Sequence, residues 1–213
     1  GVPEFLNKRD AFLFKMYQAF GHHFDFIAIP IIKKRLRMDT SQVIINEERP
    51  QLTKHLATRF KEKIGQNVNL LGEVVLGNEE ADHRYHHYLE ALESPDINYI
   101  SVKISGIYAQ THALNYEESF PELVSRMSAL YQKAIDFPYT DEDGIKRSKF
   151  INLDMEEYKD AHFTLRLFKA VLNLPQFKNY SAGIVVQAYL PDAYDFQTEL
   201  LEFAKARVDG GGA

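Results

Sequence analysis

Two different hydrophobic periods divide this chain near residue 66. In the first part, apolar residues recur at helical spacing and predict an α-helical segment over residues 4–38 and a further helix over residues 47–63. A short extended piece over residues 42–45 joins them, and Gly65 follows as a C-cap residue. The pattern therefore predicts an N-terminal helical arm over residues 1–65.

After residue 66, short apolar strands alternate with helical segments. The strand patterns cover residues 67–73, 99–105, 149–154 and 182–189. The helical patterns cover residues 78–93, 116–135, 156–172 and 192–208, and a charged loop covers residues 139–148. Four consecutive strand–helix units predict an α/β fold with a parallel sheet and right-handed crossover connections.

Such a sheet is either open or closed into a barrel. An open dinucleotide-binding sheet carries a glycine-rich turn after its first strand, and no G-x-G-x-x-G or G-x-x-x-x-G-K motif occurs at any strand–helix junction. The barrel is therefore favoured. Because a complete (βα)8 barrel takes about 250 residues, we predict that residues 66–213 form about half of one, with two open sheet edges.

Each predicted strand carries polar side chains on one of its two faces, although strands of parallel sheets are usually apolar on both. In a barrel the apolar faces pack on the helices, so the polar faces point inward, towards the mouth at the carboxyl ends of the strands. The polar faces comprise Asn67, Asn69 and Glu73, then Ser101, Lys103 and Ser105, then Asn152 and Asp154, and finally Gln187 and Tyr189.

Lys103 is the residue of these polar faces that most needs a partner. A charged side chain inside a sheet is costly unless it is paired, so Lys103 requires Glu73, Asp154 or an anionic ligand nearby. One interpretation is a closed cluster of ion pairs that only fills the barrel. The other is a cavity that binds a small zwitterion or a cofactor, which we favour because three strands bring ionisable or amide groups to the same end.

The composition narrows the class of protein. Hydrophobic residues make up 45% of the 213 residues and aromatic residues 13%, which is enough for one large domain or for a domain with an appendage. A net charge of -5 and a pI near 5.9 disfavour a nucleic-acid surface. The absence of cysteine excludes disulfides and thiolate metal sites and suits a reducing cytoplasm. No apolar run reaches the roughly 20 residues of a transmembrane helix.

Other features are weaker candidates for a function. The basic run KKRLR (33–37) suits a membrane surface, a nucleic acid or, as we favour, a solvated helix end. His83 and His87 have the spacing of zinc ligands, but no third ligand is evident, so a solvated helix face is favoured and no metal is expected. No G-x-S-x-G motif marks a serine nucleophile. Because the chain begins with Gly1 and ends in Gly-Gly-Gly-Ala, we expect both ends to be cuts.

Four ordered segments resemble the proline dehydrogenase domain: LLGEVVLGNEEAD (70–82), YISVKIS (99–105), KFINLDMEEY (149–158) and GIVVQAYLPDA (183–193). The similarity covers about residues 40–210. The segments most resemble the version of the domain in bacterial bifunctional proline utilization flavoenzymes, where an aldehyde dehydrogenase domain follows on the same chain. The resemblance implies a flavin-binding (βα)8 barrel. Residues 1–65 would then be the arm and residues 66–213 the first half of that barrel.

The same resemblance implies an activity. Members of this family use FAD to oxidise L-proline to 1-pyrroline-5-carboxylate, the first step of proline catabolism to glutamate. The reduced FAD then passes its electrons to a quinone at the membrane. These properties imply a cytoplasmic enzyme that works at the periphery of the inner membrane.

Site residues follow from the resemblance position by position. Lys103, beside the substrate carboxylate, and Asp154 are the implied catalytic residues. Glu73 matches a glutamate that pairs with a substrate-binding arginine, and Asn69 stands at a substrate-binding position where better-known members have aspartate. The implied flavin-binding residues are Asp154, Met155 in place of the usual alanine, Gln187, which would hydrogen-bond the isoalloxazine, and Ala188.

Other parts of the family's site lie beyond residue 213. They include the contacts to the flavin phosphates and the paired arginines that hold the proline carboxylate. We therefore expect the chain alone to hold FAD weakly or not at all. The alternative to an active flavoenzyme is a catalytically incomplete half-barrel, whose open sheet edges favour oligomers or self-association.

Overall fold

The computed structural model describes residues 8–20, 25–40, 44–45, 49–70, 77–109 and 115–213 of the chain. Internal contacts divide the chain into two compact units, Gly1–His55 and Leu56–Ala213. The sheet and the candidate site both belong to the second unit.

Within the described residues, the first unit is helical where helical spacing predicted helices. Helices α1 (Lys8–Phe20) and α2 (Asp25–Thr40) lie in this unit, and α3 (Arg49–Lys61) begins in it. The basic run occupies the second half of α2, where Arg35 Nε donates a hydrogen bond to Asp39 Oδ2 at 3.0 Å. Of the predicted extended piece, residues 42 and 43 lie outside the described residues, and Ile44 and Ile45 belong to no regular element.

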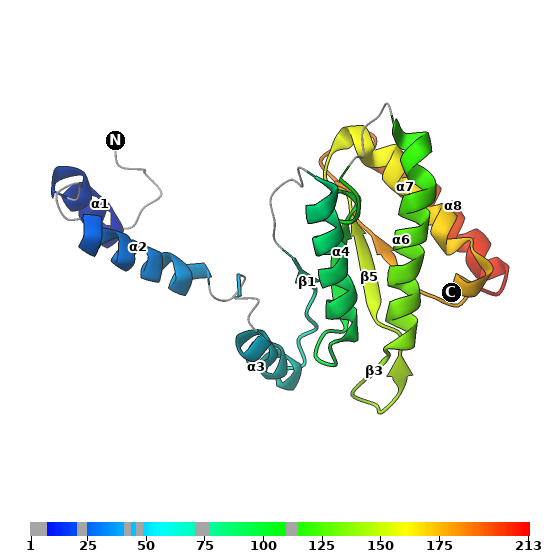
Figure 1. Cartoon of the computed structure of the whole chain (residues 1–213), viewed down its shortest axis with the longest axis horizontal. Coiled ribbons are helices and arrows are strands. Elements are labelled where there is room, and N and C mark those ends of the chain that lie inside the picture. Colours follow the sequence, from blue (N-terminus) through cyan, green and yellow to red (C-terminus); the bar gives the residue numbers. More distant parts are fainter. Residues whose placement is uncertain (1–7, 21–24, 41–43, 46–48, 71–76, 110–114) are drawn as a thin grey trace. The chain divides into compact units, whose positions relative to one another are not determined.

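The second unit is built on a four-stranded parallel sheet (Figure 1). Its strands are β1 (Val68–Asn69), β2 (Tyr99–Lys103), β5 (Phe150–Asp154) and β6 (Gly183–Ile184), paired in that order. The long helices are α4 (Asn78–Glu93), α6 (Tyr116–Asp136), α7 (Ala161–Leu172) and α8 (Ala193–Asp209). The predicted α/β fold with a parallel sheet is therefore confirmed, and the strand order follows the chain without a reversal.

Strand length distinguishes the centre of the sheet from its edges. The central strands β2 and β5 pair with each other over five residues, whereas β1 and β6 keep two residues each. The predicted fourth strand is thus wrong beyond Ile184, although Val185 N still donates to Leu153 O at 2.9 Å. Residues 71–73 of the predicted first strand lie outside the described residues. Within the described part an edge strand has a neighbour on one side only, so fewer hydrogen bonds hold it extended.

Three local predictions between the strands were also wrong. The charged loop over residues 139–148 contains an antiparallel pair, β3 (Tyr139–Thr140) and β4 (Lys146–Arg147), whose turn has Gly144 at a φ of 77°. The second strand ends at Lys103 rather than at residue 105, because the chain turns into α5 (Ile104–Ile107). The helix predicted from residue 156 starts at Ala161, after a 3-10 turn η3 (Tyr158–Asp160).

The apolar face of the sheet packs on helices, as predicted. Ile100 and Val102 of β2 and Ile151 and Leu153 of β5 are at most 1% exposed. Helix α4 contacts β2 and helix α6 contacts β5. The buried side chains of α4, α6 and α7 complete this core: Leu92, Leu123, Met127, Leu130, Tyr131, Leu165 and Val171.

One charged side chain, Lys149, is buried with this core and is only 1% exposed. It immediately precedes β5, and its Nζ donates a hydrogen bond to the backbone oxygen of Ser94. Burial lowers the pKa of Lys149 to about 8, while the charge of Asp96 acts in the opposite direction. Keeping Lys149 protonated at neutral pH therefore costs folding free energy.

Candidate active site

Lys103 and Asp154 are direct neighbours at the carboxyl ends of the two central strands. The register of the sheet sets Lys103 opposite Asp154 and Ser101 opposite Asn152. Since side chains alternate along a strand, these four lie on one face, which is the face predicted to be polar. The same row continues to Asn69 of β1, which is opposite Ser101.

Amide and hydroxyl side chains surround the Asp154 carboxylate. Asn152 Nδ2 donates to Asp154 Oδ1 at 2.9 Å, and Asn69 Nδ2 donates to Asp154 Oδ2 at 3.5 Å. Asn67 Nδ2 donates to Ser101 Oγ at 2.9 Å and links the first strand to the same network. Asn69 therefore contributes a donor where an aspartate would place a second negative charge against Asp154.

Burial raises the pKa of Asp154 above its usual value. Hydrogen bonds from Ser101 and Asn152 and the charge of Lys103 act against this rise, whereas the charge of Glu156 adds to it. Ser101 and Asn152 are 2% and 8% exposed, so the centre of the polar row is a largely dry layer, whereas Asn67 and Asn69 at its β1 edge are exposed. An acid of raised pKa in such a layer is typical of functional sites.

Among the described residues, Lys103 pairs with Glu156, a carboxylate that the predicted choice of Glu73 or Asp154 did not include. Lys103 Nζ lies 2.8 Å from Glu156 Oε1, and Ser105 Oγ donates to Glu156 Oε2 at 2.6 Å. Asp154 faces Lys103 across the two strands and acts on it through charge. Glu73 lies outside the described residues.

Gly183 explains how β6 approaches this row. It pairs with Asn152, and a Cβ added to Gly183 would lie 2.6 Å from Asn152 Oδ1 and 2.9 Å from Phe150 Cε1. Any larger residue would displace the Asn152 amide, which donates to Asp154. A glycine at this position therefore keeps the amide of Asn152 in place.

Besides Asp154, the three other residues expected near a flavin occupy different environments. Gln187 Nε2 donates to the backbone oxygen of Glu156 at 3.1 Å, which brings Gln187 next to the Lys103 pair. Met155 is 4% exposed, and its side chain packs in a core cluster with Ala161, Leu165 and Phe196. Ala188 is exposed in the turn after β6. The side chain of Gln187 thus joins the polar group, whereas that of Met155 belongs to the core.

Glu156 is the polar residue that the sequence pattern did not reveal. Acidic residues are common in the first turn of a helix, where their carboxylates usually face solvent, so the helical pattern offered no reason to single out Glu156. The available signal was the unpaired charge of Lys103, since two carboxylates, Glu156 and Glu157, directly follow the third strand. Glu157 pairs instead with Lys159 at 2.8 Å.

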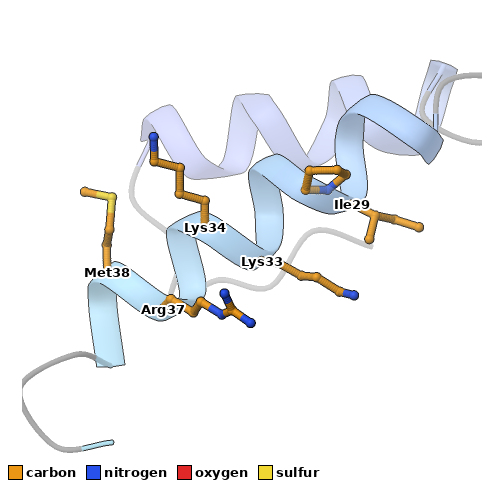
Figure 2. A pocket seen from close by; sticks show the side chains of 6 residues that line it. Ile29, Lys33, Lys34, Arg37 and Met38 are labelled. Carbon is orange, nitrogen blue, oxygen red and sulfur yellow. The ribbon is translucent and has the colours of Figure 1, made fainter. Parts of the chain in front are cut away.

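Other sequence candidates belong to other elements of the chain. The basic run of α2 lines a surface hollow of about 510 Å³ (Figure 2), formed by Ile29, Pro30, Lys33, Lys34, Arg37 and Met38 of that one helix. The three interpretations of this run stay predictions. Another hollow, of about 340 Å³, lies at the opposite ends of the central strands, where Tyr99 and Phe150 help to line it.

The histidines of α4 approach each other, with the rings of His83 and His87 4.2 Å apart. Among the residues that the structure describes, no group of three or more His, Cys, Asp or Glu side chains is arranged to hold a metal ion. Within the same described ranges, every helix is too short or too polar to cross a bilayer.

The fold and the polar group are those of a parallel α/β domain with a ligand-binding site. Parallel α/β domains bind their ligands outside the carboxyl ends of the strands, and here that position holds an ammonium, two carboxylates and several amides. The chain belongs to the proline dehydrogenase family, whose sequence pattern matches residues 52–211. This confirms the resemblance in the four sequence segments.

Solved structures of proline utilization A proteins are similar to this chain. The protein from Corynebacterium freiburgense is 34% identical over 99% of this chain, with a TM-score of 0.75, and the one from Bdellovibrio bacteriovorus is 29% identical over 84%, with a TM-score of 0.71. The protein from Bradyrhizobium japonicum shares the fold at 24% identity and a TM-score of 0.56. This chain spans 20%, 20% and 15% of their respective lengths. No curated protein sequence matches it.

Proposed function

We propose that this chain contributes to an FAD-dependent proline dehydrogenase that oxidises L-proline to 1-pyrroline-5-carboxylate. The observation that supports this proposal is the polar group at the carboxyl ends of β2 and β5, in a chain of the proline dehydrogenase family. It combines the ammonium of Lys103 with the half-buried carboxyl of Asp154, whose pKa is raised chiefly by burial. A small zwitterion needs both an ammonium and an acceptor of this kind.

In this proposal each side chain has a distinct part. The Lys103 ammonium offsets the negative charge of the proline carboxylate. Asp154 accepts hydrogen bonds from the bound substrate, and Asn69 and Asn152 hold the Asp154 carboxylate in one orientation. A bound flavin supplies the acceptor for the hydride equivalent that proline loses from C5.

The residues present fit the ring end of a flavin. Gln187 uses one N–H for the backbone oxygen of Glu156, so its second N–H and its carbonyl oxygen are available to a polar ring edge. The backbone of Met155 and the exposed Ala188 belong to the same proposed contact. A donor such as Gln187 would stabilise negative charge on the reduced ring.

The proposal includes the architecture and the partners that the family resemblance implies. A strand order that follows the chain without reversal supports about half of a (βα)8 barrel over residues 66–213, after a helical arm over residues 1–65. The proposal also includes electron transfer to a membrane quinone, a cytoplasmic location peripheral to the inner membrane and a fused aldehyde dehydrogenase domain. These features rest on the resemblance.

A second candidate is a catalytically incomplete half-barrel that lacks stable FAD and activity. It is favoured by the edge strands β1 and β6, each of which has a neighbour on one side only in the described part. Such edges call for a further strand from elsewhere in a longer protein or from a second copy. Flavin absorbance of the purified chain separates the two candidates.

The decisive experiment measures proline-dependent dye reduction by the complete flavin-loaded protein that carries this chain. Lys103→Ala and Asp154→Ala should each lower kcat/KM by about 100-fold, the size expected for losing a charged contact to a bound substrate. Lys159→Ala, which removes an exposed lysine paired with Glu157, is the matched control and should retain full activity. N-propargylglycine, which inactivates the Bdellovibrio protein, should inactivate this one unless proline is present. Wild-type rates in both site variants would refute the proposal.

A further inference from the structure

We infer that Glu156 is a positioning residue, which holds Lys103 for the substrate through its carboxylate and Gln187 for the flavin through its backbone oxygen. This inference rests on the proposed function. It concerns a residue that neither the family resemblance nor the strand pattern had indicated.

Both carboxylate oxygens of Glu156 are engaged by the end of β2. Oε1 lies 2.8 Å from Lys103 Nζ, and Oε2 accepts from Ser105 Oγ at 2.6 Å. The side chains of Lys103 and Glu156 are 25% and 37% exposed, so the pair is partly shielded from water. Burial raises the pKa of Glu156, but the hydrogen bonds from Lys103 and Ser105 outweigh this and leave the pKa below its usual value. The carboxylate is therefore ionised at neutral pH and forms charge-assisted hydrogen bonds.

This pair decides where the Lys103 ammonium points. The lysine stem is long and flexible, and the register sets Lys103 directly opposite Asp154. Without the Glu156 carboxylate, the ammonium would turn to Asp154, which the register places directly opposite Lys103. Glu156 thus keeps Lys103 and Asp154 from neutralising each other, so both remain available to a zwitterion.

The second contact of Glu156 is independent of its side chain. Gln187 Nε2 donates to the backbone oxygen of Glu156 at 3.1 Å. A substitution at residue 156 leaves this oxygen in place. Loss of the carboxylate should therefore disturb substrate binding while the flavin remains bound, which separates a positioning role from a general loss of structure.

The test uses Glu156→Gln in the complete flavin-loaded protein. We expect KM for proline to rise about tenfold, the size of losing one charge-assisted hydrogen bond, with kcat changed less than about threefold and the flavin-to-protein ratio unchanged. Ser105→Ala, which removes the hydroxyl donor to Glu156 and leaves the ion pair with Lys103 in place, should raise KM by about threefold. Glu157→Gln is the matched control, since Glu157 pairs at 2.8 Å with Lys159 on the surface, and it should leave KM unchanged.

The pH profile supplies a readout that a structural role would not move. Among the described residues, the ionisable groups around Asp154 are Lys103 on β2, Glu156 after β5 and Tyr88 on α4. Burial raises the pKa of Tyr88 to about 12, so this side chain is neutral. Arg84 of α4 acts on Glu156. Removing the Glu156 charge and pairing Lys103 with Asp154 both lower the pKa of Asp154. The acid limb of kcat/KM should therefore shift to lower pH in Glu156→Gln and stay in place in Glu156→Asp.

The outcomes separate this inference from the proposed function. A wild-type protein that does not oxidise proline overturns both. An active wild type with unchanged KM and pH profile in Glu156→Gln overturns the positioning role alone. Loss of flavin or of folding in both Glu156→Gln and Ser105→Ala would also overturn it, because the side chain would then be structural.

Discussion

The buried Lys149 offers a test of the physical reasoning that is independent of function. The perturbation is Lys149→Met, which keeps an unbranched side chain one heavy atom shorter and removes its charge. Lys149 is 1% exposed, and burial lowers its pKa from 10.5 to about 8. At about 1.4 kcal/mol per pKa unit, keeping this lysine protonated costs roughly 3 kcal/mol of folding free energy at pH 7.

The methionine variant should recover part of that cost. The lost hydrogen bond to Ser94 O lowers the gain, although this oxygen still accepts from Ile97 N at 3.3 Å. We therefore expect Lys149→Met to stabilise the chain by about 1–2 kcal/mol at pH 7. Lys146→Met on the exposed strand β4 is the matched control and should change stability by less than about 0.5 kcal/mol.

The pH dependence gives the sign of the effect. Because the folded pKa lies below the unfolded one, the unfolded chain binds more protons between pH 8 and pH 10.5, so the contribution of Lys149 to stability rises with pH across that window. The advantage of the methionine variant should accordingly shrink from pH 7 to pH 9.5. Urea unfolding of both proteins at several pH values measures it, and a stability difference that is unaffected by pH would refute the reasoning.

Two further substitutions test the packing around the site and the C-terminal helix. Gly183→Ala should destabilise the chain by about 1–3 kcal/mol, since its Cβ would lie 2.6 Å from Asn152 Oδ1, and urea midpoints would show this. If Gly183→Ala left stability unchanged, the close approach would not constrain the sheet. Arg207 donates to the backbone oxygens of Phe177, Lys178 and Tyr180 at 3.0, 3.2 and 3.2 Å, so Arg207→Met should cost about 2–4 kcal/mol in the same assay. Arg166→Met, which removes an exposed pair with Glu117, should shift the urea midpoint far less than Arg207→Met, and equal losses in the two arginine variants would contradict the argument.

The local periodicity of the sequence predicted most of the architecture. The pattern predicted α4 over its observed residues 78–93, the centre of the sheet at β2 and β5, and which residues of these strands face the helices. These features depend on side chains that repeat along one segment, and burial of an apolar face fixes them wherever that segment packs. The family was equally accessible, because its four segments occur in order along the chain.

Contacts between segments that are distant in the sequence determined the remaining features of the structure. The predicted fourth strand shrank to Gly183–Ile184 because an edge strand lacks a second partner, which no local pattern records. Lys103 visibly needed a counter-ion, but only the register and the turn after β5 selected Glu156. A sequence states that a charge must be paired, whereas the partner depends on which carboxylate the tertiary fold brings within about 3 Å.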